Sequence, residues 1–296
     1  MQKRPLGKTG LEVSVLGFGG AEIGFENAPQ ADVDKLLNAA LDGGLNVIDT
    51  GECYADSEEK IGKAVSHRRA EYHLFTKCGH SSGFSEPDWD PGMLARQIDR
   101  SLQRLQTDRL DLIQLHSCSE AILREGAVIE VVQRAKEAGK TRFIGYSGDR
   151  NDSAYAVSTG LFDVLQTSCS FADQECVTLT LPGCVEKGMG VIAKRPIANA
   201  AWKEPGVGAY GRPYWERLQK LQYDFLKLSS DEIASIALRF TLAQPGVSTA
   251  IVGSKNPSRW KQNSAYLEAG PLEPGIIQAI RTRWIEVAEP EWVGQN

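Results

Sequence analysis

The sequence predicts a closed parallel (β/α)8 barrel, the TIM-barrel fold, with an N-terminal β-hairpin. Three observations predict this fold. Eight short apolar runs of strand character recur along the 296 residues, amphipathic helical segments separate them, and strands this short and apolar need cover on both faces. An open doubly wound sheet is the alternative arrangement of the same elements. Because no linker divides the chain, we expect a single domain over residues 1–296.

The elements are expected in a regular order. The hairpin is predicted over residues 1–17, because the turn residues Gly7 and Thr9-Gly10 precede the alternating segment LEVSV. A stretch rich in Pro, Gly and aromatic residues, 196–229, is too long for an ordinary connection and indicates a functional loop. The eight expected strands are residues 13–19, 45–50, 73–77, 110–116, 142–147, 162–168, 190–196 and 248–254.

Four of the intervening segments show helical periodicity clearly. Each carries one apolar stripe, as expected of a helix that lies on a sheet. Gly139 provides a stop signal, and Ser229 with Glu232 forms a capping box. Pro182 and Gly183 interrupt the segment before the seventh strand, so the least regular helix is expected there. The stripes are Val33, Leu36, Leu37, Ala40 and Leu41; Leu94, Ile98, Leu102 and Leu105; Val128, Val131, Val132 and Ala135; and Ile233, Ile236, Ala237 and Phe240.

Composition narrows the functional classes. The formal net charge of -5 and the pI near 5.5 argue against nucleic acid or an anionic membrane as a partner. No apolar run approaches the roughly 18 residues of a membrane helix, and the first ten residues lack a signal-peptide core, so we expect a cytoplasmic protein. The six cysteines form no C-x-x-C pair, which argues against zinc and disulfides and favours free thiols.

Four reactive side chains are expected at one mouth of the barrel. Asp49, Lys77 and His116 end three strands, and Tyr54 follows the second strand. A phenol is a poor acid, but a nearby lysine ammonium is expected to lower its pKa by roughly one to three units. Singly, a strand-end Asp and Lys are more often a structural ion pair, and a lone His is usually a satisfied core group. Together they predict a site that protonates an oxyanion while another agent supplies hydride.

The segments that carry these residues also carry a family resemblance. RPLGKTGLEVSVLGFGG, IDTGECYADSEEKIGKAV, FTK and LIQLHS resemble the hairpin, signature and strands of the aldo-keto reductase superfamily, and the similarity covers nearly the whole chain. The resemblance implies that Tyr54 is the general acid, that Lys77 and Asp49 tune it, and that His116 orients a carbonyl. It also implies a small carbonyl or alcohol substrate and a nicotinamide cofactor.

Two segments are expected to hold that cofactor. GFGGAEIG, which includes Gly19, Gly20 and Ala21, lacks the G-x-G-x-x-G spacing, so its glycines either admit a ligand closely or form only a turn. In IVGSKNPSRWKQN, Asn256 is expected to cap a helix with Pro257 in its first position, which creates an anion site or only a well-capped surface helix.

The segment IVGSKNPSRWKQN is similar to the family's adenosine 2′-phosphate site. The similarity implies phosphate contacts from Ser254 and Arg259 and adenine contacts from Gln262 and Asn263. Lys255 is expected to restore the charge of a family lysine that is replaced here by glycine. We therefore expect NADPH to be favoured, with NADH also possible.

The rim near the nicotinamide departs from the family pattern. Ser147 and Gln166 match residues that bind the carboxamide, but Gly148 replaces a usual Asn. Lys194 and Arg195 stand where a stacking aromatic is often found. Either they form a solvated rim, or Arg195 lies over the nicotinamide or reaches the pyrophosphate.

Two other functions fit some of these features. A barrel-mouth lysine, Lys77 or Lys194, also suits a Schiff-base aldolase, although the adenosine-phosphate segment argues against it. Some relatives in the resembled family sense nucleotides as channel subunits. Trp89 and Trp202 are expected in loops at the barrel mouth, where they either shape the substrate pocket or only pack. A C-terminal tail with Trp284 and Trp292 either folds back over the mouth or likewise only packs.

Overall fold

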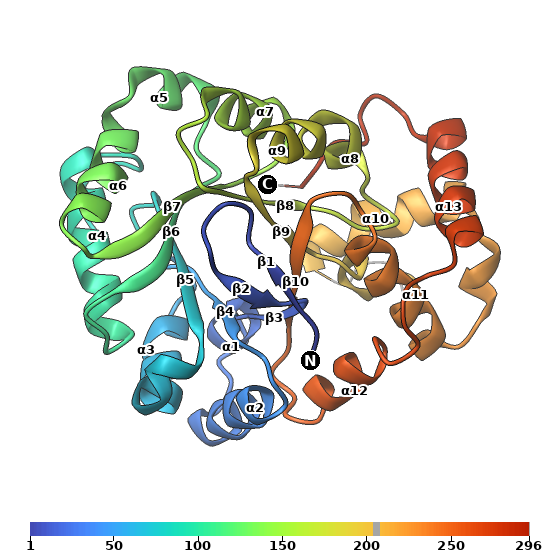
Figure 1. Ribbon diagram of the computed structural model, residues 1–296, viewed down its shortest axis with the longest axis horizontal. Helices are drawn as coiled ribbons and strands as arrows, with labels where there is room; N and C mark the ends of the chain where they lie inside the picture. The colour runs from blue at the N-terminus through green and yellow to red at the C-terminus, as the bar shows by residue number, and fades with distance from the viewer. Residues whose placement is uncertain (204–207, 296) are drawn as a thin grey trace.

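The computed structural model describes residues 1–203 and 208–295. Within them, eight parallel strands close a barrel in the order β10-β3-β4-β5-β6-β7-β8-β9 (Figure 1). The prediction of a closed barrel is therefore confirmed, and the open-sheet alternative is wrong. The strands are β3 (Leu16–Gly19), β4 (Val47–Asp49), β5 (His73–Cys78), β6 (Leu110–His116), β7 (Thr141–Ser147), β8 (Val164–Ser168), β9 (Gly190–Lys194) and β10 (Val247–Gly253).

The predicted hairpin is formed by β1 (Lys3–Pro5) and β2 (Glu12–Ser14), which pair antiparallel. Its turn side chains, Leu6 and Leu11, are buried in an apolar cluster with inward-facing barrel residues. The hairpin thus closes the N-terminal end of the barrel, where it crosses the centre in Figure 1. Because Val13 belongs to the hairpin, the first barrel strand begins at Leu16 and not at residue 13 as the sequence suggested.

The barrel interior is divided into an apolar and a polar layer. Side chains two residues apart on a strand point to the same face. The layer against the hairpin consists of Val47, Phe75, Leu112, Val164, Ile192 and Ile251. Two residues further along the same strands, at the C-terminal mouth, come Asp49, Lys77, Gln114, Gln166, Lys194 and Gly253. Because inward-facing residues recur every second position, the barrel mouth is lined mainly by polar side chains, and the layer beneath them, next to the hairpin, is apolar.

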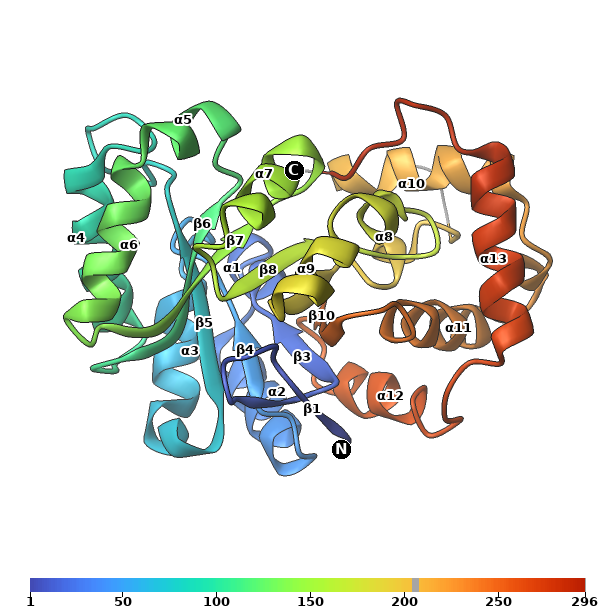
Figure 2. The same cartoon turned by 45° about the horizontal axis from the view of Figure 1, so that its top comes forward.

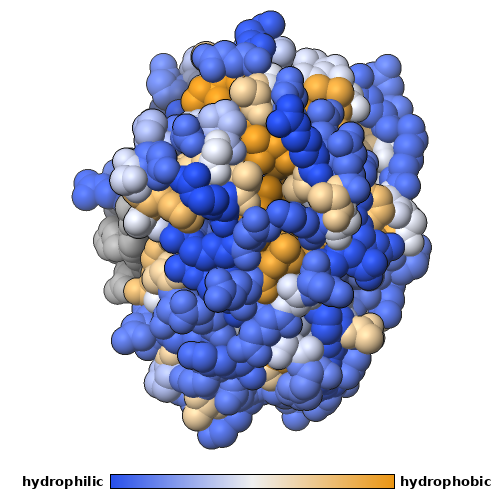
Figure 3. Space-filling view, turned by 90° about the vertical axis from the view of Figure 1, so that its left-hand side faces the viewer, coloured by the Kyte–Doolittle hydropathy of each residue, from blue (hydrophilic) through white to orange (hydrophobic). Residues whose placement is uncertain are grey.

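Helices surround the barrel and bury their apolar stripes against it (Figure 2). On the one side of the molecule that Figure 3 shows, the surface is largely hydrophilic, and apolar side chains gather between polar ones near the centre and the top of the view. No helix in residues 1–203 or 208–295 is both long and apolar enough to cross a membrane. The helices are α1 (Ala21–Phe25), α2 (Gln30–Asp42), α3 (Ser57–Val65), α4 (Pro91–Arg104), α5 (Glu120–Glu125), α6 (Ala127–Glu137), α7 (Arg150–Thr159), α8 (Glu175–Leu179), α9 (Leu181–Lys187), α10 (Gly208–Leu221), α11 (Ser230–Leu242), α12 (Arg259–Ala265) and α13 (Pro274–Val287).

Helix boundaries confirm some sequence signals and correct others. The capping box at Ser229 and Glu232 is present, and the interrupted helix is broken at Thr180 into α8 and α9. Helix α12 begins at Arg259 with Ser258 at its N-cap, two residues later than the cap expected at Asn256. The Asn256 side chain still accepts from the Ser258 amide (3.0 Å), the bond that a capping Asn makes, and it thereby stabilises the turn that leads into the helix.

The stretch 196–229 is more ordered than the sequence suggested. It contains α10 and a 3₁₀ turn at Asp224–Lys227, while residues 204–207 lie outside the described part of the chain. Tyr214, Leu218 and Leu221 of α10 are buried with residues of α11 and α13 in a second apolar cluster. This packing makes α10 a structural helix beside the barrel, as both ribbon views show.

Candidate active site

Strand register brings the polar strand ends to one level. Parallel strands of a barrel all point the same way, so their C-terminal residues share a mouth. The paired residues there are Gly253 with Gly19, Gly19 with Asp49, Lys77 with Gln114, His116 with Ser147, Ser147 with Gln166, and Ser168 with Lys194.

Asp49 and Lys77 form a fully buried ion pair at this mouth. Their side chains are 2% and 1% exposed, and the Lys77 ammonium donates to Asp49 Oδ1 and to the Thr50 carbonyl (2.6 Å). Burial opposes the charged lysine, but the neighbouring Asp49 carboxylate leaves the pKa of Lys77 above its usual value. The pair therefore places a fixed positive charge beneath Tyr54.

Tyr54 lies directly over this charge. The Lys77 Nζ is 4.9 Å from the centre of the Tyr54 ring, and the His116 ring meets it edge-on at 5.6 Å. Burial raises the pKa of the Tyr54 phenol above its usual value, although the Lys77 charge acts in the opposite direction. The sequence expectation of a lowered pKa is thus wrong for this structure, because desolvation outweighs the ammonium. The phenol stays a proton donor throughout the neutral range.

His116 ends β6 as an uncharged imidazole. Burial, with the Lys77 charge as the next cause, lowers the pKa of His116 well below its usual value. Its Nδ1 faces the Cys53 thiol at 3.4 Å, and the ring of His80 lies 5.1 Å away. A neutral imidazole at this position can donate one hydrogen bond without adding charge to the site.

Two amides extend the tetrad around Asp49. Gln166 Nε2 donates to Asp49 Oδ2 at 2.8 Å, and Gln114 Nε2 donates to the same oxygen at 3.1 Å. Ser147 donates to Gln166 Oε1 at 3.1 Å, so the residues expected to bind a carboxamide are linked to the tetrad. Gln114 was missed because it lies inside an apolar-looking strand. The signal that could have identified it is its spacing of two residues from His116, which puts both side chains on the same face of the strand.

A second buried carboxyl, Glu58, contacts β5 through Thr76. Glu58 Oε1 accepts from the Thr76 hydroxyl at 2.7 Å, and Arg104 lies 3.8 Å from Oε2. Burial raises the pKa of Glu58 to about 7, since these partners compensate only part of the desolvation. Between its ordinary pKa and about 7, the folded protein holds a proton that the unfolded chain has released.

This proton makes stability pH-dependent. The free energy of unfolding is expected to fall as pH rises from about 5 to about 7, by at most about 3 kcal/mol from Glu58. Glu58→Gln keeps an acceptor for Thr76 and is expected to flatten this fall, as measured by urea unfolding at pH 5, 6, 7 and 8. Asp173, whose pKa burial also raises to about 7, is unchanged in both proteins and serves as the common background. Identical slopes for the two proteins would remove the assignment.

Lys194 and Arg195, at the end of β9 on the same mouth of the barrel, form ion pairs with Asp149. Lys194 Nζ is 3.0 Å from Asp149 Oδ2, and Arg195 lies 3.8 Å from the same oxygen. Burial acts to raise the pKa of Asp149, but Lys194 and hydrogen bonds from Ser168 and Thr167 hold it below its usual value. The solvated-rim alternative is therefore wrong, because Lys194 and Asp149 form a buried ion pair. Sequence reasoning missed Asp149.

The C-terminal tail also reaches this rim. Arg195 donates to the Gln295 carbonyl and to Ser168 Oγ (2.9 Å), and Arg150 donates to the Gly294 carbonyl at 2.9 Å. Trp292 packs on Trp284 of α13 with ring centres 5.4 Å apart, so the tail does fold back. In this structure the guanidinium of Arg195 is engaged by the chain itself.

The first-strand glycines are closely approached by other parts of the chain. A side chain at Gly20 would meet Ser57 Oγ at 2.8 Å, so the close approach there is made by α3. Gly19 contacts the Gly253 backbone, and Ala21 begins α1. A side chain at Gly253 would overlap the Glu22 carboxylate, the end of a flexible side chain that would have to move aside.

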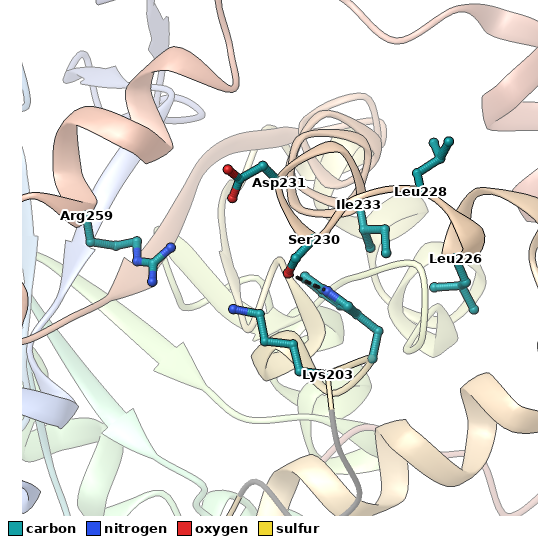
Figure 4. Close-up of a pocket in the computed structure, with 8 residues that line it drawn as sticks. Lys203, Leu226, Leu228, Ser230, Asp231, Ile233 and Arg259 are labelled. Atoms are coloured by element: carbon teal, nitrogen blue, oxygen red, sulfur yellow. Dashed lines mark hydrogen bonds between the residues drawn. The ribbon is translucent and has the colours of Figure 1, made fainter.

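The segment after β10 borders a pocket of about 520 Å³ (Figure 4). The Arg259 guanidinium and the Lys203 amine extend toward one another across it. Arg259 Nη1 donates to Gln262 Oε1 at 2.6 Å, and Lys255 pairs with Glu26 at 2.6 Å, so Lys255 is directed to an acidic partner. Ser254 is half-buried and Asn263 is buried.

The two predicted substrate tryptophans lie apart from each other. Trp202 donates to Ser230 Oγ at 3.0 Å and lines the Arg259 pocket. Trp89 packs on Gly79 and edge-on against His80 at 5.6 Å, so one ring separates it from His116. Phe25, which is 63% exposed, covers Tyr54 at 5.4 Å and is an aromatic that sequence reasoning missed at the mouth.

Comparisons with known proteins agree with this geometry. Residues 15–284 match the model of the aldo/keto reductase family. The chain is 32% identical to L-galactose dehydrogenase from Arabidopsis thaliana, over 90% of this chain and 88% of that protein, and 25% identical to D-threo-aldose 1-dehydrogenase from a Pseudomonas species, over 95% and 94%.

A solved structure is similar over its whole length. The holo form of an aldo-keto reductase from Bacillus halodurans superposes with a TM-score of 0.83 at 27% identity, covering 99% of both chains. The family match, the relatives and the barrel with its Asp, Tyr, Lys and His at one mouth lead to one conclusion: this chain belongs to the aldo/keto reductase family of oxidoreductases, which act with nicotinamide cofactors.

Proposed function

We propose that this protein reduces an aldehyde or ketone with NADPH, or catalyses the reverse alcohol oxidation. The observation that carries the proposal is the buried Asp49–Lys77 pair directly beneath the Tyr54 phenol. A fixed ammonium beside a phenol stabilises the phenolate that remains after proton donation. An ion pair with a structural role alone would not require a phenol beside it, so the position of Tyr54 favours a catalytic role.

Each polar group has one proposed task in the reduction. When bound, the reduced nicotinamide supplies hydride to the carbonyl carbon. Tyr54 donates its proton to the oxygen, which becomes the alcohol hydroxyl, and Lys77 holds the resulting phenolate until solvent reprotonates it. His116 donates a hydrogen bond that orients the same oxygen before transfer. Asp49 keeps Lys77 charged and in place.

The residues present fit a dinucleotide phosphate. Arg259 and Lys203 face a common pocket, and their cationic donors suit a phosphate group, while the Trp202 indole offers an apolar wall. Ser254, Gln262 and Asn263 are the further candidates for the adenosine end. Ser147 and Gln166 are the candidates for the carboxamide, with Gly19, Gly20 and Ala21 along the first strand end.

The relatives suggest a substrate class. L-galactose dehydrogenase and D-threo-aldose 1-dehydrogenase are both named for aldoses. The mouth combines an exposed aromatic, Phe25, with the His80–Asp88 pair (3.0 Å). Aromatic faces with adjacent polar groups suit a polyhydroxylated ring, so we include aldoses in the proposed substrate range.

An activity panel tests this function. Oxidation of NADPH is followed with aliphatic aldehydes, ketones and sugars, and reduction of NADP⁺ with aldoses. Turnover with at least one class is expected. Tight cofactor binding without turnover would instead identify a nucleotide sensor, and trapping of a substrate on lysine by borohydride would identify an aldolase. Lys77 is poorly suited to the latter, because its raised pKa keeps the amine protonated.

Arg259→Ala tests the cofactor phosphate. Loss of a charged hydrogen-bond donor is expected to raise KM for NADPH about 10- to 100-fold while KM for NADH changes much less. Lys261→Ala, an exposed cation on the same helix, is the matched control and should leave both values unchanged. Equal weakening of the two cofactors by Arg259→Ala would refute the 2′-phosphate assignment.

A further inference from the structure

The Cys53 thiol lies against the imidazole of His116. Its Sγ is 3.4 Å from His116 Nδ1, within reach of a sulfur hydrogen bond. Cys53 directly precedes Tyr54 in a turn held by two backbone bonds, from the Glu52 amide to the Lys77 carbonyl (3.1 Å) and from the Tyr54 amide to the Gly51 carbonyl (2.9 Å). The backbone that places the phenol therefore also places the thiol.

The protonation states decide which group donates. Burial raises the pKa of Cys53 to about 11, so the thiol keeps its hydrogen at neutral pH. The neutral His116 ring carries one hydrogen, on either Nδ1 or Nε2. An imidazole nitrogen lone pair is a better acceptor than a thiol sulfur, so the favoured arrangement has S–H donating to Nδ1 and the ring hydrogen on Nε2.

The opposite nitrogen is then available to a substrate. His116 Nε2 makes no hydrogen bond with any part of the chain that the structure describes. The charged groups near the ring, namely Lys77, Lys194, Arg195 and the neighbouring His80, all oppose its protonation. Cys53 thus acts on the position of the ring hydrogen and not on the ring charge.

We propose that Cys53 is a positioning residue, whose thiol donates to His116 Nδ1 and holds the tautomer that carries its hydrogen on Nε2. That hydrogen is the one directed to the carbonyl oxygen in the reduction, so the kinetic consequence rests on the proposed function. The structural claim, a defined tautomer set by the residue before Tyr54, stands independently of any substrate.

Nitrogen NMR of the full-length protein tests the tautomer directly. The chain has four histidines, and labelling them with ¹⁵N allows His116 to be assigned by the signal that is lost in His116→Gln. The Nε2–H form is expected in the wild type and in Cys53→Ser, whose hydroxyl can also donate. Cys53→Val removes the donor, and a mixture of tautomers is expected. An Nδ1–H form in the wild type, or an unchanged spectrum in Cys53→Val, would overturn the proposal.

Kinetics supply the second readout. Cys53→Val is expected to lower kcat for carbonyl reduction about tenfold with KM for NADPH unchanged, and Cys53→Ser should recover to within about threefold of the wild type. Cys118→Val, at a buried thiol two residues beyond His116, is the control for packing at the end of β6. Equal kcat values for the Val and Ser variants at position 53 would also refute the role. If the wild type reduces no carbonyl, the proposed function fails while the NMR result still decides the tautomer.

Discussion

Tyr54→Phe is expected to lower the rate of carbonyl reduction by about 10²- to 10⁴-fold while cofactor affinity stays near the wild-type value. The reason is that the phenol hydroxyl is the proposed proton donor, and a positioned general acid contributes this much to a rate. The ring itself remains, so its contacts with Phe25 and His116 are retained. Steady-state kcat and the Kd for NADPH, measured by fluorescence, separate the two effects.

A matched control makes this result specific. Tyr155→Phe removes a hydroxyl from α7, where the ring packs under Arg124 at 4.2 Å, and should leave kcat unchanged. Because burial raises the pKa of Tyr54, the acidic form persists through neutral pH, and wild-type reduction should be lost only at strongly alkaline pH. If Tyr54→Phe reduced carbonyls at the wild-type rate, the Tyr54 phenol would not be the proton donor.

Lys77→Met is expected to lower the free energy of unfolding by about 3–5 kcal/mol at pH 7. The substitution leaves the Asp49 carboxylate buried without its cation, and an uncompensated buried charge carries a cost of this size. The double variant Asp49→Asn/Lys77→Met removes the charge as well and should recover much of the loss. Urea unfolding of the wild type, each single variant and the double variant measures the coupling.

Both Lys77 variants should nevertheless be inactive in carbonyl reduction, since neither can stabilise the Tyr54 phenolate. An exposed pair provides the control: Lys255 and Glu26 are 2.6 Å apart but 55% and 50% exposed, and Lys255→Met should change stability by no more than about 1 kcal/mol. If Lys77→Met and Lys255→Met lowered the free energy of unfolding by similar amounts, burial would not be the reason for the cost of removing Lys77.

The parts of the site that the sequence predicted are those controlled by local pattern. Asp49, Lys77 and His116 end apolar strands, and once the chain is known to close a parallel barrel their convergence follows. Gln114 escaped notice because one polar residue inside the apolar strand LDLIQLH could either face the barrel mouth or be a hydrogen-bonded group within the core, and the sequence does not say which. Its partner Asp49 is 65 residues away in the chain.

Other features depended on contacts between distant segments. The Cys53–His116 contact spans 63 residues, and the bond from Arg195 to the tail spans 100. The expected loop at 196–229 was wrong for the same reason, since local signals do not report how α10 packs in the second apolar cluster.

By itself, the sequence determined the repeating strand and helix periods, the N-terminal hairpin and the four reactive residues, three of them at strand ends and Tyr54 just beyond one. Only the tertiary structure decided their electrostatic states. How completely water is excluded from Tyr54, His116 and Glu58 depends on side chains contributed by other elements, and desolvation is the largest of the causes that shift their pKa values. A pattern of residue types carries no measure of that exclusion, so the direction of the Tyr54 shift became known only from the packed fold.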